Sequence, residues 1–298
     1  MAFTPIQAPS SQKPALGSRD VAIHNMIRDQ FTVSTWLLLG AGLQGLLALI
    51  LPARYALLPA VTILALRSID TLLQTCGITK DRAAEGVIRG KFSAQIPDRE
   101  GNIPLEPAEQ EIVLLHLATR SNHPLGMMAP GYKEVIDYMG KLLADLDRNS
   151  HENGYLGSTG WIPFTERKTS NQIMAAVYFR SYKDLHDFAH GAMHLETWTW
   201  FTSISRRYPH LSIMHETYVA PKGHHENIYV NNHRTGLAAT SVKVPIKPIH
   251  PGTNGTEQGL FRWISPVVDA GRGVLKSSRG RLGAADGSDN EAYKMKDY

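Results

Sequence analysis

The segment "NQIMAAVYFRSYKDLHDFAHGAMHLETWTWF", residues 171–201, predicts a strand that passes directly into a helix. Its first part, residues 171–181, is rich in β-branched and aromatic side chains, which favour strands. Ser181 and Asp184 then stand at the spacing of a capping box, so the helix is expected to begin at Ser181. A strand followed at once by a helix is a unit from which layered α and β domains are built.

Three more strands and a second helix are predicted on either side. "EIVLLHLATR" (111–120) is rich in leucine and β-branched residues, "GYLGSTGWIPF" (154–164) is a short strand with glycine interruptions, and "LSIMHETYVA" (211–220) alternates along its length. Between the first two, "GYKEVIDYMGKLLADLDRN" (131–149) carries apolar residues at a period of 3.6, which predicts a helix with one buried face. The order β-α-β-β-α-β predicts a ferredoxin-like α+β domain over residues 110–220.

A strongly apolar segment, residues 35–68, precedes this domain. Its first uncharged run, 35–51, is about as long as the lower limit for a membrane-spanning helix, and the second, 55–66, is shorter. Soluble cores seldom contain two adjacent helices that are apolar on every face. We therefore expect a membrane hairpin, or one tilted span and an interfacial segment, rather than a buried core hairpin. In a hairpin, Arg54 lies at the turn, and positive charge on both flanks favours two cytosolic ends.

The remaining segments are predicted from composition. Residues 1–34 are expected to form a disordered leader, rich in Pro, Ser and Gln, that ends in an interfacial lead-in. Residues 69–109 carry turn signals and are predicted to be a linker. Residues 221–272 are punctuated by Pro and Gly and are expected to be an arm that packs on the domain or on a second subunit. Residues 273–298 are predicted to be a disordered tail.

Composition and missing motifs narrow the function. The chain has 298 residues and a formal net charge of +4, spread along its length, which gives no reason to expect nucleic acid as a partner. Cys76 is the single cysteine, so no internal disulfide is possible, and no Cys/His pattern has zinc spacing. Glycine-rich nucleotide motifs and GxSxG are absent too, so the sequence shows no sign of a flavin, a nicotinamide or a nucleotide.

Histidines at four-residue spacing, His186, His190 and His194, point to chemistry on the helix that begins at Ser181. They form a slanting stripe that Trp198 continues. A metal site, a haem site and an acid/base site over a hydrophobic pocket are all compatible with this stripe, as is a helix that is merely rich in histidine. Gly191 is expected to break the helix, which leaves His186 solvated and places His190, His194 and Trp198 beside a pocket.

His215 lies in the middle of the last predicted strand. A lone histidine on a strand is often a hydrogen-bonded core residue. Imidazole is also the side chain best suited to move protons near neutral pH. The pattern alone leaves both roles open for His215.

Two blocks of the sequence resemble a known family. "YFRSYKDLHDFAHGAMHLETWTWF" (178–201) and "HETYVAPKGHHENIYVNNHRTGLAAT" (215–240) are similar to the fungal antibiotic-biosynthesis-type (ABM) monooxygenase family, typified by the fumagillin-pathway enzyme. The resemblance covers roughly residues 110–240 and implies a dimeric α+β barrel, in which two ferredoxin-like subunits pair their sheets. The apolar segment before the domain is also similar to that of the longer fungal members.

The resemblance implies that a hydrophobic secondary metabolite, a terpenoid or a polyketide, is oxidised by O₂ at a membrane. It implies no metal or organic cofactor, because the substrate itself would supply a stabilised carbanion that reacts with O₂. The expected partners are a small apolar metabolite, O₂, the membrane and a second copy of the chain. The expected location is the endoplasmic reticulum membrane, with the catalytic domain in the cytosol.

The resemblance also implies roles for particular residues. His194 or His215 is expected to act as the catalytic base. The substrate pocket is expected to be formed by five side chains, of which the last supplies a hydrogen-bond donor: His190, Trp198, Tyr178, Phe188 and Asn232. The alternatives are a haem enzyme with His194 or His215 as the axial ligand, as in the aldoxime dehydratases, a cyclase, isomerase or dehydratase, and a binding protein without chemistry.

Overall fold

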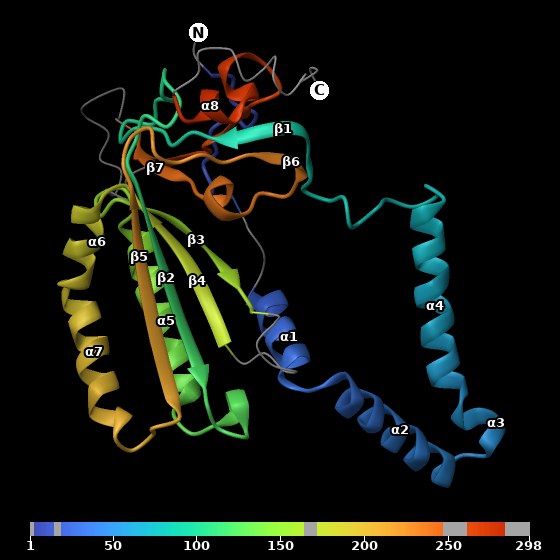
Figure 1. The fold of residues 1–298 in the computed structure, drawn as a ribbon. Coiled ribbons are helices and arrows are strands. Elements are labelled where there is room, and N and C mark those ends of the chain that lie inside the picture. The colour runs from blue at the N-terminus through green and yellow to red at the C-terminus, as the bar shows by residue number, and fades with distance from the viewer. Residues whose placement is uncertain (1–2, 15–18, 164–171, 247–260, 284–298) are drawn as a thin grey trace, which may run out of the picture.

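The structure, a computed structural model, describes residues 3–14, 19–163, 172–246 and 261–283, and its centre is an antiparallel four-stranded sheet (Figure 1). The strand order in this sheet is β3-β4-β2-β5. Its strands and the helices between them are β2 (Ile112–Ser121), α5 (Tyr132–Arg148), β3 (Tyr155–Trp161), β4 (Gln172–Phe179), α6 (Tyr182–Ala189), α7 (Ala192–Ser205) and β5 (Leu211–Ala220). The α+β class is confirmed, and the chain order matches the predicted β-α-β-β-α-β arrangement, with the second helix divided in two.

Strand register decides which side chains lie beneath the helices. On the central strand β2, Leu117 lies opposite His215 of β5, and Leu115 lies opposite Thr217. Because side chains alternate between the two faces of a sheet, these four share one face. Leu115 also packs with Leu146 of α5 and Leu185 of α6, which shows that this face is the one the helices cover.

A second layer packs on one end of the opposite face of the sheet and was not predicted. It contains a three-stranded sheet in the order β6-β1-β9 and a β7-β8 pair. Phe92 and Ala94 of β1 are fully buried there against Leu156 of β3 and Val267 of β9. The elements are β1 (Ile88–Ala94), β6 (Tyr229–Asn232), η2 (Gly236–Ala239), β7 (Val242–Pro245), β8 (Phe261–Ile264) and β9 (Val267–Asp269).

This layer corrects two sequence-based assignments and gives a third its structure. The predicted linker, 69–109, contains β1, which pairs with both β6 and β9. The predicted arm, 221–272, packs on the domain, one of the two expected alternatives, and does so as strands of the same layer, with residues 247–260 outside the described part. The expected disorder at the N-terminus does not hold for residues 3–14, because Pro5 and Ser10 form bridges to β9 and β8. These short strands are ordered by partners far away in the sequence, so local composition does not reveal them.

The predicted tail, 273–298, is also corrected where the structure describes it. Residues 273–283 hold a 3-10 helix, η3 (Gly273–Lys276), and a short helix, α8 (Ser278–Arg281). Leu275 is buried, and the buried Arg281 guanidinium forms an ion pair with Glu226. Residues 284–298 lie outside the described residues.

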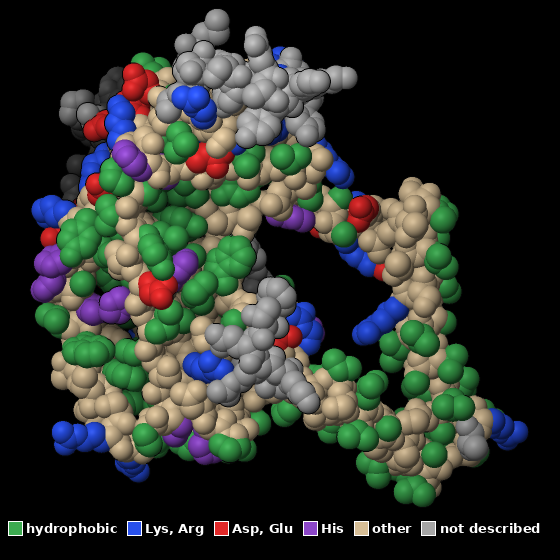
Figure 2. All heavy atoms as spheres, in the orientation of Figure 1, with side chains coloured by type: hydrophobic (Ala, Val, Ile, Leu, Met, Phe, Trp, Pro, Cys, Tyr) green, Lys and Arg blue, Asp and Glu red, His purple; other side chains and the backbone are tan. Residues whose placement is uncertain are grey.

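Two apolar helices project from the rest of the molecule (Figure 1). None of the residues of α2 or α4 is buried, and Figure 2 shows hydrophobic side chains along both helices. Among the described residues, two helical segments are long and apolar enough to cross a membrane. The N-terminal helices are α1 (Arg19–Gln30), α2 (Val33–Ile50), α3 (Ala53–Ala56) and α4 (Leu58–Thr75).

Candidate active site

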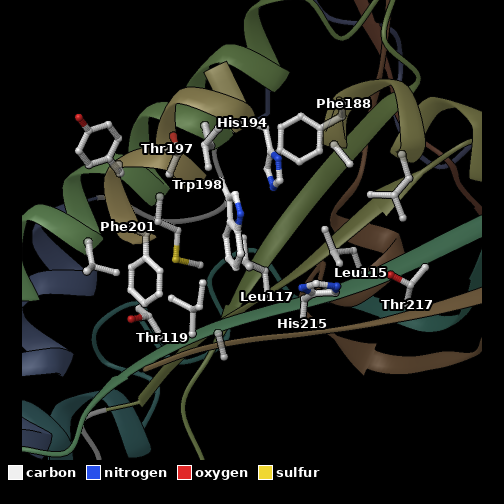
Figure 3. A pocket seen from close by; sticks show the side chains of 18 of the residues that line it. Leu115, Leu117, Thr119, Phe188, His194, Thr197, Trp198, Phe201, His215 and Thr217 are labelled. Atoms are coloured by element: carbon white, nitrogen blue, oxygen red, sulfur yellow. The ribbon is translucent and has the colours of Figure 1, made fainter. Parts of the chain in front are cut away.

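A cavity of about 280 Å³ lies between the helix-covered face of the sheet and the helices α5, α6 and α7 (Figure 3). Strands β2 and β5 form its floor, and the three helices form its walls. Its lining is mostly aliphatic and aromatic, which is typical of sites that bury a small organic molecule. The strand side chains in the floor are Leu115, Leu117, Thr119, Ile213, His215 and Thr217.

The break between α6 and α7 shapes one wall of the cavity. Ser181 caps α6, since its Oγ accepts a hydrogen bond from the Asp184 backbone N–H at 3.1 Å. Helix α6 ends at Ala189, and Gly191 occupies the N-cap position of α7. A side chain at Gly191 would approach the Phe188 carbonyl oxygen at 3.1 Å, so the tight turn there favours glycine. The predicted helix start at Ser181 and the predicted break are both confirmed, and the Asp184 carboxylate accepts a hydrogen bond from the Ser181 hydroxyl at 2.7 Å.

This turn brings Phe188 and His194 together at the cavity wall. Their rings meet edge to face with centroids 5.3 Å apart. Trp198 follows His194 by one helical turn and also lines the cavity. Figure 3 shows Trp198 extending from α7 toward Leu117 on the floor. The sequence thus folds locally so that one imidazole and two aromatic rings share a wall.

His194 has an environment suited to a neutral imidazole. Burial lowers its pKa, and the nearby His215 and His190 act in the same direction, against an opposing contribution from the Ala189 backbone. Its buried Nδ1 has no hydrogen-bond partner in the described part of the chain. A lowered pKa keeps the ring uncharged near neutral pH, which leaves it able to accept a proton.

His215 approaches the cavity from the opposite side. It lies on the edge strand β5, and Figure 3 shows its ring on the floor while His194 extends from the helical wall above. Thr217, two residues further along β5, lies on the same face of the strand. A molecule in the cavity would therefore contact imidazoles on two sides.

The cavity lining, as the described residues form it, contains no Asp, Glu, Lys or Arg. Its polar groups are imidazoles, hydroxyls and the Trp198 and Trp200 indoles, so a charged ligand would lose hydration without gaining a counter-ion. Among the described residues, no group of three or more His, Cys, Asp and Glu side chains is placed to hold a metal ion. The arrangement suits a neutral, mostly apolar ligand.

Four of the predicted site residues meet at this cavity: Phe188, His194, Trp198 and His215. His190 does not line it. The His190 ring is exposed, and its Nδ1 lies 2.9 Å from the His186 carbonyl oxygen, so this residue ends α6 rather than forming a pocket wall. His186, which was expected to be solvated, is exposed and also belongs to the lining, which places it at the cavity mouth.

Tyr178 and Asn232 lie away from the cavity, so their predicted roles are corrected. Tyr178 points to the opposite face of β4 from Val177 and Phe179, and it packs against the second layer. Asn232 lies exposed at the end of β6, opposite Ile88 of β1. Neither side chain can contact a molecule held between the sheet and the helices.

Several residues that line the cavity were not predicted, although the periodicity of their strand or helix places them on one face. Leu115, Leu117 and Thr119 alternate on β2, and Tyr138 and Leu142 are one turn apart on α5. The periodicity of β2 and of α5 therefore groups these residues correctly. Nothing in the sequence alone indicated which face of the strand or of the helix would lie beside the histidines.

Comparison with known proteins identifies the family. The pattern that defines the Monooxygenase af470-like family matches residues 112–237, which include all of the cavity-lining strands and helices. The curated Monooxygenase af470 of Aspergillus fumigatus is 33% identical over 283 residues, covering 95% of this chain and 98% of the relative. The chain belongs to the af470-like monooxygenase family. The resemblance drawn from the two sequence blocks is therefore confirmed.

Solved structures match parts of this af470-like chain. An aldoxime dehydratase is 14% identical with a TM-score of 0.38, covering 51% of this chain and 41% of its own. The cofactor-independent oxygenase SnoaB of Streptomyces nogalater is 11% identical with a TM-score of 0.25, covering 37% and 91%. A possible oxidoreductase from Bacteroides thetaiotaomicron is 12% identical with a TM-score of 0.27, covering 37% and 98%.

Proposed function

We propose that this chain is a membrane-associated monooxygenase that oxidises a neutral, hydrophobic intermediate of secondary metabolism, a terpenoid or a polyketide. One observation carries the proposal: two imidazoles, His194 and His215, face a single cavity whose described lining has no charged side chain. Membership of the family indicates the reaction class, and the uncharged, mostly apolar lining of the cavity indicates the kind of substrate.

The proposed first step is proton abstraction from an activated C–H group of the substrate. His194 is the favoured base because burial lowers its pKa and keeps it neutral. The carbanion that forms is stabilised as an enolate, whose oxygen needs a hydrogen-bond donor. His215 and Thr217, on the opposite side of the cavity, offer an N–H and an O–H for this purpose.

O₂ is the proposed oxidant. The electron pair of the carbanion forms a C–O bond to O₂, and the proton taken by the base returns to the outer oxygen, which gives a hydroperoxide. Loss of water from this group converts a CH₂ into a carbonyl, so that one oxygen atom enters the product and the other leaves as H₂O. Bulk water must be kept from the carbanion, which would otherwise be reprotonated, and the mostly apolar lining contributes to this.

We propose that no metal or organic cofactor takes part. Haem is the alternative that the sequence left open. An imidazole for the iron is available in His194 or His215, but the described lining has no Lys or Arg to pair with the two haem carboxylates. The residues present therefore fit haem poorly, and no step is assigned to it. A Soret band in the purified protein would contradict this proposal.

The apolar helices α2 and α4 support membrane association, because an oily intermediate partitions into the bilayer beside the enzyme. We propose the endoplasmic reticulum membrane, a helical hairpin and a cytosolic catalytic domain. A second copy of the chain is proposed to cover the exposed apolar side chains on the outer face of the four-stranded sheet. These include Trp161, Met214 and Tyr218. The mass of the detergent-solubilised protein tests the dimer.

Oxygen consumption tests the proposed reaction. Turnover of the true substrate is expected to consume one O₂ for each product molecule, with ¹⁸O from ¹⁸O₂ found in the product. Product without O₂ uptake would indicate a cyclase, isomerase or dehydratase. Tight binding of an apolar ligand with no product would indicate a binding protein. Either result would contradict the proposed function.

The pH dependence of kcat/KM should follow the protonation of His194. Because burial lowers the pKa of this imidazole, the acid limb of the profile is expected below about pH 6.5, the ordinary value for histidine. Activity is lost as pH falls through the folded-state pKa and is retained above it. Kinetics between about pH 4.5 and 8 measure this limb. A limb well above the ordinary value would exclude a neutral His194 as base.

A further inference from the structure

Residues on both sides of the two apolar helices belong to one sheet. Before the helices, the Ile6 N–H donates to the Val267 carbonyl at 3.0 Å, and the Asp269 N–H donates to the Thr4 carbonyl at 3.0 Å. After the helices, Phe92 of β1 pairs with Asp269 of the same strand, β9. Strand β9 thus joins a segment that precedes the helices to one that follows them.

Further contacts hold the preceding segment on the folded part of the chain. Ser10 and Trp263 exchange backbone hydrogen bonds of 3.0 and 2.7 Å, and Lys13 forms an ion pair with Asp147 of α5. At the end of α1, the Gln30 side-chain oxygen accepts a hydrogen bond from the Met127 N–H at 3.1 Å. Residues 3–14 and the end of α1 therefore lie on the same side of any membrane as β1 and the cavity.

A chain that starts and finishes on one side of a bilayer crosses it an even number of times. The helices between these segments either both cross or neither crosses. A single span in α2, with α4 lying flat at the interface, would place residues 4–6 and 88–94 on opposite sides, although both pair with β9. This constraint comes from connectivity alone and does not depend on how the helices are oriented.

Helix α2 decides between two crossings and none. It has 18 residues and no charged side chain, and its length of about 27 Å approaches the roughly 30 Å of the hydrocarbon core. Leu37, Leu38 and Leu39 are 69%, 72% and 56% exposed and point in three directions around the axis. A helix that lies on a membrane needs a polar face. Helix α2 has none, so it favours crossing.

Helix α4 is then the returning span, although its own composition is less decisive. Its N-terminal half is uncharged, and its charged residues, Arg67 and Asp70, lie toward the end that leads to β1. Arg82 forms an ion pair with Asp70 there, on the folded side. At the other end, Arg54 lies in the short turn helix α3, and the Gln44 side chain closes this turn by donating to the Ala56 carbonyl at 2.9 Å.

We infer that α2 and α4 cross the bilayer as a pair, with the turn at Arg54 on the side opposite to the cavity and to both flanking segments. The inference rests on the proposed membrane association and deepens it. The bilayer is the one partner that an uncharged, all-round apolar helix of this length fits, and the shared strand β9 requires the return.

Cysteine labelling tests the arrangement, because Cys76 is the only cysteine and lies exposed at the end of α4. The full chain is compared with two single-cysteine variants, R54C/C76A at the turn and S11C/C76A on an exposed position before the helices. Sealed membrane vesicles are treated with a membrane-impermeant maleimide before and after detergent. The C76A variant is the unlabelled control.

The unaltered chain, through Cys76, and the S11C/C76A variant are expected to react alike in sealed vesicles. The R54C/C76A variant is expected to behave in the opposite way until detergent is added. Equal labelling of all three proteins would show that neither helix crosses. Opposite behaviour of the unaltered chain and S11C/C76A would show a single crossing. Either result overturns the inference while leaving the oxygenase proposal intact.

Alkaline carbonate extraction separates this inference from the proposed chemistry. The chain is expected to stay with the membrane pellet. Its release would overturn the paired crossing together with membrane association, and oxygen uptake would still report the chemistry separately.

Discussion

Replacing His194 with glutamine is expected to lower kcat by about 10²- to 10⁴-fold, the usual contribution of a general base. Glutamine keeps a polar side chain of similar length but cannot accept the substrate proton. The His215→Leu variant, which removes the N–H, is expected to lose about 10²-fold or more if the imidazole donates to the developing enolate, since one such donor is worth roughly this much. Oxygen uptake and single-turnover product formation measure both effects.

His190→Gln is the matched control. His190 lies four residues before His194 and belongs to the same histidine stripe, but it is exposed and outside the cavity lining. This variant is expected to keep wild-type kcat. Circular dichroism of all three variants separates a loss of chemistry from a loss of fold. Full activity in both His194→Gln and His215→Leu would remove the basis of the proposed mechanism.

Replacing Phe92 with alanine is expected to lower the free energy of unfolding by about 3–5 kcal/mol, the typical cost of truncating a buried phenylalanine. Phe92 is fully buried between the four-stranded sheet and the second layer, and its ring stacks on Tyr229 with centroids 5.0 Å apart. The cavity left behind cannot collapse easily between two sheets. Urea unfolding of the detergent-solubilised protein, followed by tryptophan fluorescence, measures the change.

Val230→Ala is the control for this experiment. Val230 pairs with Lys91 on the same three-stranded sheet, but its side chain is 43% exposed. Its truncation is expected to change the free energy of unfolding by only about 0.5 kcal/mol. A similar small change for Phe92→Ala would mean that the second layer does not stabilise the ferredoxin-like sheet through this ring.

The ferredoxin-like part could be predicted because its signals are local. The helix α5 shows a clear 3.6-residue period, and Ser181 and Gly191 mark the start and the break of the next helical segment. The second layer could not be predicted in the same way. Strand β1 contains Gly90 at a φ of 86° and a register shift, which interrupt its alternation. Its partners have only three or four residues each, too few to show a period.

The residues of the candidate site that could be predicted are likewise those with local signals. His194 and Trp198 were found from residue type and helical spacing, and His215 from its place on a strand. Tyr178 was assigned to the wrong face, although alternation with Phe179 on β4 contained the answer. Asn232 required knowledge of the pairing between β6 and β1, which joins residues far apart in the chain. The sequence indicated the local secondary structure but not the pairing of strands that lie far apart in the chain.

The pairing of residues 4–10 with β8 and β9 also sets an order of events during biosynthesis. Residues 4–10 leave the ribosome long before their partners, Trp263 and Val267. Closing so large a loop is entropically costly and slow, so the second layer can form only after β8 and β9 have been synthesised. Until then the nascent chain exposes unpaired strand edges, which makes it a client for chaperones during that interval.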